Sequence, residues 1–377
     1  MKKETAAERP HALLSCSGAH RWMNCPGSVK LSEGFPDKGS IYADEGTLAH
    51  EAGEALIDTG EISQEHIDKI DKFYADHPEL EYSTQEMLED VRIYADFVNR
   101  EYTKEREVDP EPMLRTEMRV DLTRWIPDGF GTSDIVIARW GKLHIIDLKY
   151  GKGVKVSAVD NPQLRLYALG ALAALDEEFH ITEVVMTIYQ PRTGNISEDF
   201  ITADDLYSWG ANVVKPAADL AMSDNAPIST GEWCTFCPAR KVCKVRAEKY
   251  TALRAYMAKT TLSAGEIAEI LNLADGLVKW VEDIKSGAIE RIQSGDTLPG
   301  WKVVEGTSRR RFTIKDNDII ERCVKAGFVR EKVMTVKAKG ITDLEKLMGK
   351  ERFQEVLGDS VEKPAGKPTL AVDEEWR

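Results

Sequence analysis

The chain has 377 residues, 42% hydrophobic and 30% charged, a composition typical of a globular protein with one large domain or two smaller ones. No apolar run approaches the roughly 20 residues that a membrane span needs, and the first ten residues lack the apolar segment of a signal peptide, so we expect a cytoplasmic protein. The net charge of −14 argues against a nucleic-acid partner, but the segment from Pro238 to Arg254 carries six basic residues and one acid, a local track on which phosphates could bind.

Hydrophobic periodicity predicts helices first, then strands, then helices and strands in alternation. In chain order, the predicted elements are helices over residues 17–24, 42–58 and 82–104, strands over 113–120, 131–138 and 143–150, a helix over 162–175, strands over 181–189 and 197–201, and a helix over 203–222. The third helix opens with Ser83 and Glu86, which have the spacing of a capping box. This order predicts an α/β fold in which helices flank a mixed sheet.

The sequence changes character near residue 258. Ser263 and Glu266 form a second capping box, which opens a helix predicted to run to about Gln293. Two further helices are expected near residues 316–325 and 343–357, with short mixed elements beside them. We therefore predict one domain over residues 1–258 and a smaller α+β domain over residues 259–377, whose role the sequence does not indicate.

Two carboxylates are predicted to face each other on a β-hairpin. If the hairpin turns symmetrically about Trp140 and Gly141, opposed residue numbers sum to 281, so Asp134 lies opposite Asp147. Their Cβ atoms would be roughly 4.5–5.5 Å apart, where like charges destabilise a sheet, and Lys149 would project from the same face. A divalent cation explains the pair, because Mg²⁺ prefers a few carboxylates together with water and phosphate oxygens. The alternative is a solvated sheet face in another register.

A second group of residues has the spacing of a metal centre. The pattern CxxC-x5-C is formed by Cys234, Cys237 and Cys243. Tetrahedral sites need four ligands, so one must come from elsewhere in the chain. The candidates are the remaining cysteines, Cys16, Cys25 and Cys323. Spacing alone does not separate zinc from an iron–sulfur cluster.

Four sequence elements together resemble the RecB-like nucleases of the PD-(D/E)XK type. They occur in the order of that family over about residues 12–255, and they are the stretch Gly46–His50, Gly131-x-x-Asp134, Asp147-x-Lys149 and Gln163-x-x-x-Tyr167. The pair Cys25-Pro26, together with the cysteine trio, is similar to the iron–sulfur members of that family, such as the AddB nuclease domain and the CRISPR-associated spacer-trimming exonucleases.

The resemblance implies a restriction-endonuclease-like fold and metal-dependent hydrolysis of DNA phosphodiester bonds, with exonuclease activity expected. It implies that Mg²⁺ or Mn²⁺ is held by His50, Asp134, Asp147 and the backbone carbonyl of Leu148. It also implies that Lys149 orients or activates the attacking water, while Gln163 and Tyr167 face the site from one side of a helix.

The same resemblance implies a [4Fe-4S] cluster with zinc as the rival, held by Cys25, Cys234, Cys237 and Cys243. It places the chain in a subfamily carried by phages and prophages that acts in recombination, repair or end processing in a bacterial host cell. DNA is then the expected partner, with a phage single-strand annealing or single-strand binding protein as a second. The alternative is a non-catalytic iron–sulfur or zinc protein that binds DNA or serves as a scaffold. The presence of Asp134, Asp147 and Lys149 together argues against that alternative.

Overall fold

The structure is a computed structural model that describes residues 12–35, 39–80, 82–151, 153, 155–251, 261–305, 316–327, 329–334, 340–341, 344–345 and 349–361. The chain divides into two units, Met1–Val303 and Val304–Arg377. The boundary expected near residue 258 lies outside the described residues. The helix that follows it, α10 (Ala264–Gln293), belongs to the first unit.

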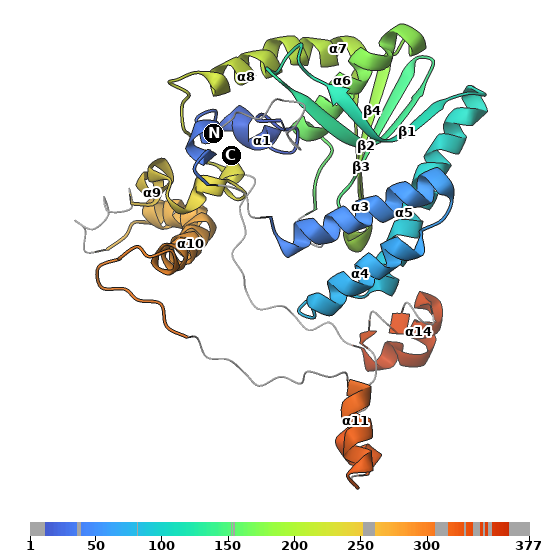
Figure 1. Cartoon of the computed structure of the whole chain (residues 1–377), viewed down its shortest axis with the longest axis vertical. Helices are drawn as coiled ribbons and strands as arrows, with labels where there is room; N and C mark the ends of the chain where they lie inside the picture. The colour runs from blue at the N-terminus through green and yellow to red at the C-terminus, as the bar shows by residue number, and fades with distance from the viewer. Residues whose placement is uncertain are drawn as a thin grey trace. The chain divides into compact units, whose positions relative to one another are not determined.

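The first unit contains all the strands that the structure describes (Figure 1). Its elements, in chain order, are α1 (Ala19–Asn24), α2 (Ser28–Ser32), α3 (Ile41–Thr59), α4 (Gln64–Asp76), α5 (Thr84–Val108), β1 (Met113–Asp121), β2 (Phe130–Arg139), β3 (Lys142–Leu148), α6 (Pro162–Phe179), β4 (Glu183–Gln190), the 3-10 turn η1 (Pro191–Thr193), β5 (Asn195–Thr202), α7 (Ala203–Trp209), the π-helical turn η2 (Gly210–Val214), α8 (Lys215–Met222), the 3-10 turns η3 (Glu232–Cys234) and η4 (Pro238–Lys241), α9 (Lys244–Thr251) and α10.

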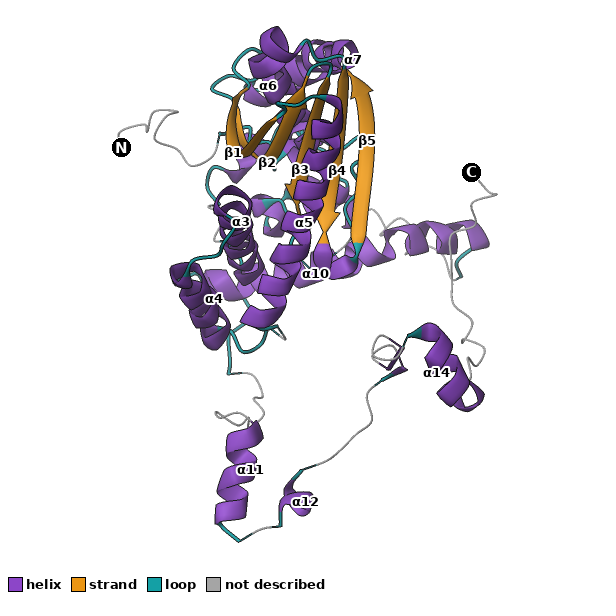
Figure 2. Ribbon diagram, turned by 90° about the vertical axis from the view of Figure 1, so that its right-hand side faces the viewer, coloured by secondary structure: helices purple, strands orange, loops and turns teal. Residues whose placement is uncertain are grey.

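The five strands form one mixed sheet in the order β1-β2-β3-β4-β5 (Figure 2). β3 and β4 are parallel, because α6 carries the chain back across the sheet between them, and the other neighbours are antiparallel. The predicted α/β fold is therefore confirmed. The predicted hairpin register is confirmed as well, since the pairs from Arg139↔Lys142 to Ile135↔Ile146 all sum to 281.

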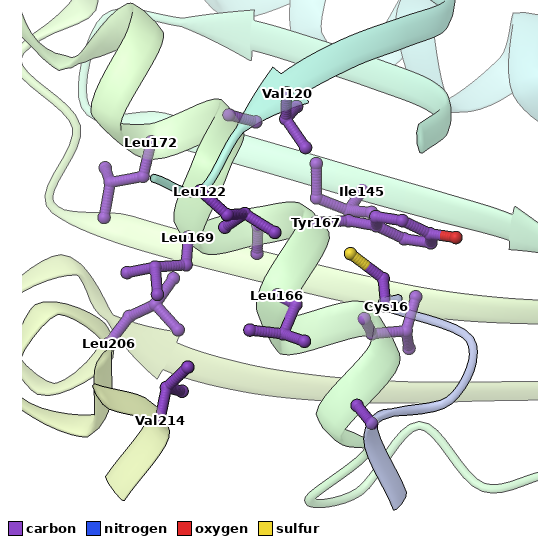
Figure 3. Close-up of a cluster of buried hydrophobic side chains, with 14 of the residues drawn as sticks. Cys16, Val120, Leu122, Ile145, Leu166, Tyr167, Leu169, Leu172, Leu206 and Val214 are labelled. Carbon is purple, nitrogen blue, oxygen red and sulfur yellow. The ribbon is translucent and has the colours of Figure 1, made fainter. Parts of the chain in front are cut away.

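Alternate residues of the central strands face two different helical layers. On one face, Val136 and Ile145 join the core that α6 covers, part of which is drawn in Figure 3. On the other face, Ile135 and Ile146 pack with side chains of α5 such as Tyr94. Burial on both faces explains why the strands of the hairpin are almost uninterrupted apolar runs.

Helices α3, α4 and α5 form a layer with a small core of its own. Helix α4 was not predicted, because its segment is strongly charged and buries only Ile70 and Tyr74. The two capping boxes, at Ser83–Glu86 and Ser263–Glu266, are both present. The helix predicted over residues 203–222 is formed by α7, the turn η2 and α8 in direct succession.

In the second unit, the described residues form helices and no strand, so the strands of the expected α+β domain are not among them. The helices are α11 (Asp316–Lys325), α12 (Arg330–Val333) and α14 (Lys350–Leu357). Across the part of the chain that the structure describes, no helix is both long and apolar enough to cross a membrane.

Candidate metal centre and cysteine cavity

Asp134 and Asp147 lie next to each other where β2 and β3 part. Ile135↔Ile146 is the last backbone pair of the two strands, so the two aspartates occupy the next opposed positions. Asp134 Oδ2 accepts a hydrogen bond of 2.8 Å from the backbone N–H of Leu148, which replaces the missing ladder bond and fixes this carboxylate beside β3. Asp147 is only 2% exposed. The predicted carboxylate pair is therefore held in place by the hairpin itself.

Three further predicted residues surround Asp147. The ammonium of Lys149 lies 2.8 Å from Asp147 Oδ2 and donates a hydrogen bond of 3.1 Å to Gln163 Oε1. The amide of Gln163 donates to Asp147 Oδ1 at 3.4 Å and to the hydroxyl of Tyr167 at 3.1 Å. Helix α6 thus directs both residues of the QxxxY pattern toward the carboxylate pair, because they are one helical turn apart.

His50 approaches the pair from helix α3. Its Nδ1 lies 3.4 Å from Asp134 Oδ2. Among the described residues, one group brings three possible metal ligands together, with atoms within 4.8 Å of one another: His50, Glu117 and Asp134. Asp147 is not part of that group. Asp134 is therefore close to His50 and Glu117, and it also lies beside Asp147.

Glu117 is the site residue that the sequence analysis missed. It lies in the middle of β1, opposite Asp134 in the register of β1 with β2, but the backbone pairing skips it. Its φ is +44°, in the left-handed region, which costs about 1–3 kcal/mol for a residue other than glycine. The sequence signal for Glu117 would have been the register of β1 with β2. Paired residues of these strands have numbers with the same sum as 117 and 134, but that register was not predicted.

The electrostatics of this centre favour a cation. Burial, followed by the charge of Asp134, raises the pKa of Glu117 to about 7 against the opposing effect of His50. Burial and Asp147 likewise raise the pKa of Asp134 although His50 and Lys149 lower it. Burial opposes the charge of Lys149, but the two neighbouring aspartates outweigh it and raise the pKa of the ammonium. The two aspartates thus share Lys149, and Glu117 adds a third carboxylate beside Asp134, an arrangement that a divalent cation would stabilise.

Gly131 of the GxxD pattern has a packing role. A Cβ at this position would lie 2.6 Å from Cys16 Sγ and 2.9 Å from Cε1 of Tyr167, so any side chain would displace the tyrosine that faces the centre. Figure 3 shows Cys16 beside the Tyr167 ring. Cys16 is 2% exposed, and burial raises the pKa of its thiol to about 12, so it is a core residue.

The four cysteines predicted to hold a cluster line a single cavity, and they are Cys25, Cys234, Cys237 and Cys243. Three basic side chains line it too, namely Arg21, Arg240 and Arg246. The backbone N–H of Ser229 donates to Cys25 Sγ at 3.3 Å, which ties the segment after α1 to the segment before the trio. No three of the cysteines, all of which the structure describes, have Sγ atoms within 4.8 Å of one another. Cys323 belongs to the second unit.

The fold and these residues define a mixed α/β protein with a histidine–carboxylate centre on its sheet and a separate cysteine cavity. The chain belongs to the family described as "Protein of unknown function (DUF2800)", whose model matches residues 11–377. A solved structure described as "Crystal structure of SSO0001" is 16% identical in sequence, with a TM-score of 0.23, over 55% of this chain and 98% of that chain.

Proposed function

We propose that this protein is a metal-dependent DNA nuclease of the PD-(D/E)XK type, acting as an exonuclease. The observation that supports this most strongly is the convergence of Asp134, Asp147 and Lys149 at one point of the sheet. Gln163 of α6 donates a hydrogen bond to Asp147 and another to Tyr167. Mg²⁺ or Mn²⁺ bound here would neutralise charge on the phosphate and lower the pKa of a coordinated water.

The residues have separate tasks in this proposal. Asp134 binds the cation together with His50 and Glu117 on one side and with Asp147 and the carbonyl of Leu148 on the other. Lys149, which Asp147 and Gln163 hold in place, orients the attacking water or the phosphate. Gln163 and Tyr167 position the DNA strand. All of these residues belong to the first unit.

The alternative function is a non-catalytic DNA-binding or scaffolding protein with the same cysteine cavity. Its weakness is energetic. Glu117 and the two aspartates repel one another, and the backbone strain at Glu117 adds to that cost. A protein without metal chemistry would gain stability by losing these charges. Their retention, with Lys149 in contact, favours the nuclease.

The test is the activity of the purified protein on end-labelled DNA, linear and circular, single- and double-stranded, with Mg²⁺ or Mn²⁺. We expect degradation of linear substrates from their ends, survival of covalently closed circles, and complete loss of cleavage in EDTA. Failure to cleave any of these substrates, in a preparation that binds Mn²⁺, would favour the non-catalytic alternative. In this proposal the enzyme acts in the cytoplasm of a bacterial host, with a phage single-strand annealing or single-strand binding protein as partner.

We further propose that the cysteine cavity holds a [4Fe-4S] cluster. The four predicted cysteines line the cavity together with Arg21, Arg240 and Arg246, of which Arg240 and Arg246 are ion-paired with Asp283. Zinc, which four thiolates also bind, is the rival metal, and iron analysis separates the two. The cluster would close a chain loop of about 200 residues and stabilise the first unit.

Replacing Cys25 by Ser should remove the iron and lower the unfolding temperature, because the remote ligand of the cluster is lost. Replacing Cys16 or Cys323 by Ser should leave the iron content unchanged, since neither lines the cavity. Iron analysis, visible absorbance and thermal unfolding of the three variants measure these effects. Loss of iron in the Cys16 variant with normal iron in the Cys25 variant would show that the fourth ligand is Cys16.

A further inference from the structure

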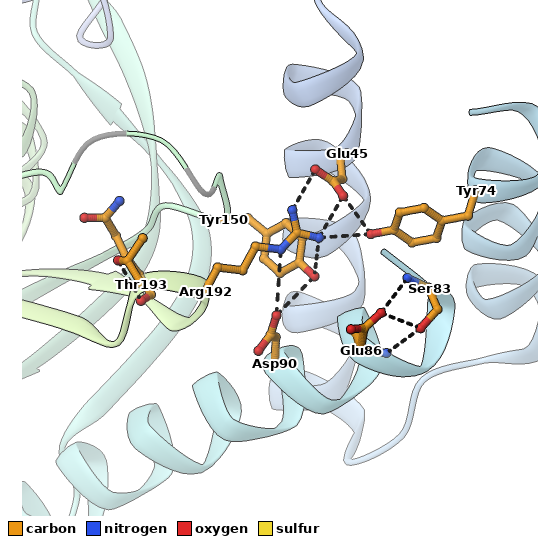
Figure 4. Close-up of polar contacts among 9 residues, drawn as sticks. Glu45, Tyr74, Ser83, Glu86, Asp90, Tyr150, Arg192 and Thr193 are labelled. Atoms are coloured by element: carbon orange, nitrogen blue, oxygen red, sulfur yellow. Dashed lines mark hydrogen bonds and ion pairs between the residues drawn. The ribbon is translucent and has the colours of Figure 1, made fainter. Parts of the chain in front are cut away.

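Arg192 is a buried cation outside the metal centre, and its environment is drawn in Figure 4. Its guanidinium makes two bonds to the carboxylate of Glu45, of 2.9 and 2.7 Å, and donates to the hydroxyls of Tyr74 at 3.1 Å and Tyr150 at 3.0 Å. Asp90 lies 3.9 Å away. The side chains of Arg192 and Glu45 are 3% and 1% exposed. We call these five residues the Arg192 cluster.

The Arg192 cluster joins two segments that carry residues of the metal centre, namely helix α3 and the chain directly after β3. Arg192 itself follows β4 in the turn η1. Glu45 lies on α3, five residues before His50, and Tyr150 directly follows Lys149. Tyr74 and Asp90 add helices α4 and α5. One guanidinium therefore connects the helical layer to the ends of the two central parallel strands.

This connection acts on position more than on stability. A buried ion pair contributes little net stability compared with apolar side chains of similar volume, since desolvation of both charges offsets their attraction. The apolar core of α3, α4 and α5 already holds these helices together. What the planar guanidinium adds is a fixed geometry, because its two parallel bonds to Glu45 and its bonds to two hydroxyls can form in only one arrangement.

We propose that Arg192 is a positioning residue for the metal centre. Through Glu45 it fixes the rotation of α3 about its axis and its position along that axis. These in turn set the distance from His50 to Asp134. Through Tyr150 it holds the chain directly after Lys149. The inference rests on the proposed metal centre, and it predicts that loss of the Arg192–Glu45 pair weakens cation binding by way of His50.

The test is a double-mutant cycle that combines changes in the Arg192–Glu45 pair with His50→Ala. The quantity measured is the affinity for Mn²⁺, by calorimetry on the full chain without DNA. The double variant Glu45→Gln, Arg192→Met removes both charges and keeps an acceptor for the hydroxyl of Tyr74. We expect it to remain folded and to bind Mn²⁺ about 10–100-fold more weakly, as changes to residues that orient a ligand do. Adding His50→Ala to this variant should cause little further loss, because His50 is already displaced.

A matched control is a second buried ion pair, at the turn of the β2–β3 hairpin that carries the two aspartates at its other end. Glu105, which is 5% exposed, pairs with Arg139 and Lys142 far along β2 and β3 from the aspartates. Glu105→Gln, Arg139→Met removes an equivalent pair. The affinity of this control variant for Mn²⁺ should equal that of the wild type. Adding His50→Ala to it should lower the affinity as much as His50→Ala does in the wild type.

The outcomes separate the two proposals. If the wild type binds Mn²⁺ in a manner that depends on His50, but Glu45→Gln, Arg192→Met behaves like the control, the positioning role is wrong and the metal centre stands. If His50→Ala leaves the wild-type affinity unchanged, the proposed metal centre fails and the positioning role with it. Should the double variant not fold, Arg192→Lys keeps the charge without the two parallel bonds, and the same non-additivity with His50→Ala is expected.

Discussion

Replacing Asp134 or Asp147 by Asn is expected to abolish DNA cleavage in Mg²⁺ and to leave the protein folded. Each substitution removes a negative charge that the cation requires, so no metal-bound water is activated. The fold should tolerate the change, because the two carboxylates repel each other. Burial and Asp147 raise the pKa of Asp134, so its ionised form is destabilised at neutral pH, and an uncharged amide relieves that cost.

The measurements are cleavage of end-labelled DNA and thermal unfolding without metal. The Asp134 variant should unfold at the wild-type temperature or above it, whereas the Asp147 variant loses the ionic partner of Lys149 and should remain folded at a lower stability. Asp219→Asn, at an exposed position on α8, is the control and should cleave at the wild-type rate. Full activity in either the Asp134 or the Asp147 variant would rule out this pair as the catalytic centre.

Replacing Lys149 by Ala is expected to reduce turnover by about 10²–10⁴-fold, the contribution of a positioned acid–base group, while metal and DNA binding stay close to wild type. The ammonium is held by Asp147 and Gln163 and, with its raised pKa, remains protonated at neutral pH. It therefore acts on the phosphate or the attacking water and leaves metal binding to the carboxylates.

Tyr167→Ala is the informative comparison for the Lys149 variant. Tyr167 is linked to the centre by a hydrogen bond from Gln163, so its loss should weaken DNA binding more than it slows the chemical step. Calorimetry with Mn²⁺, DNA binding in Ca²⁺ and cleavage in Mg²⁺ distinguish the two effects. If Lys149→Ala cleaves at a rate near wild type, the Asp-x-Lys interpretation is wrong, and the lysine only balances the charge of the aspartates.

The sequence by itself determined the parts of this protein that depend on neighbours along the chain. The register of β2 with β3 follows from a short turn at Trp140-Gly141, so the opposition of Asp134 and Asp147 could be read from residue numbers. The same holds for the capping boxes and for the one-turn spacing of Gln163 and Tyr167 on α6. In each case short-range geometry favours the arrangement that the structure has.

Only the tertiary structure decided the contacts between distant segments. Glu117 reaches the centre because β1 pairs with β2 and because its own backbone adopts a left-handed conformation, which no local pattern indicates. Arg192 and Glu45 are 147 residues apart, and each looks in the sequence like an ordinary surface charge. Their burial together depends on how the helical layer packs against the strand ends. Side chains are placed there by the whole fold, since a buried charge is tolerated only where its partner is brought to it.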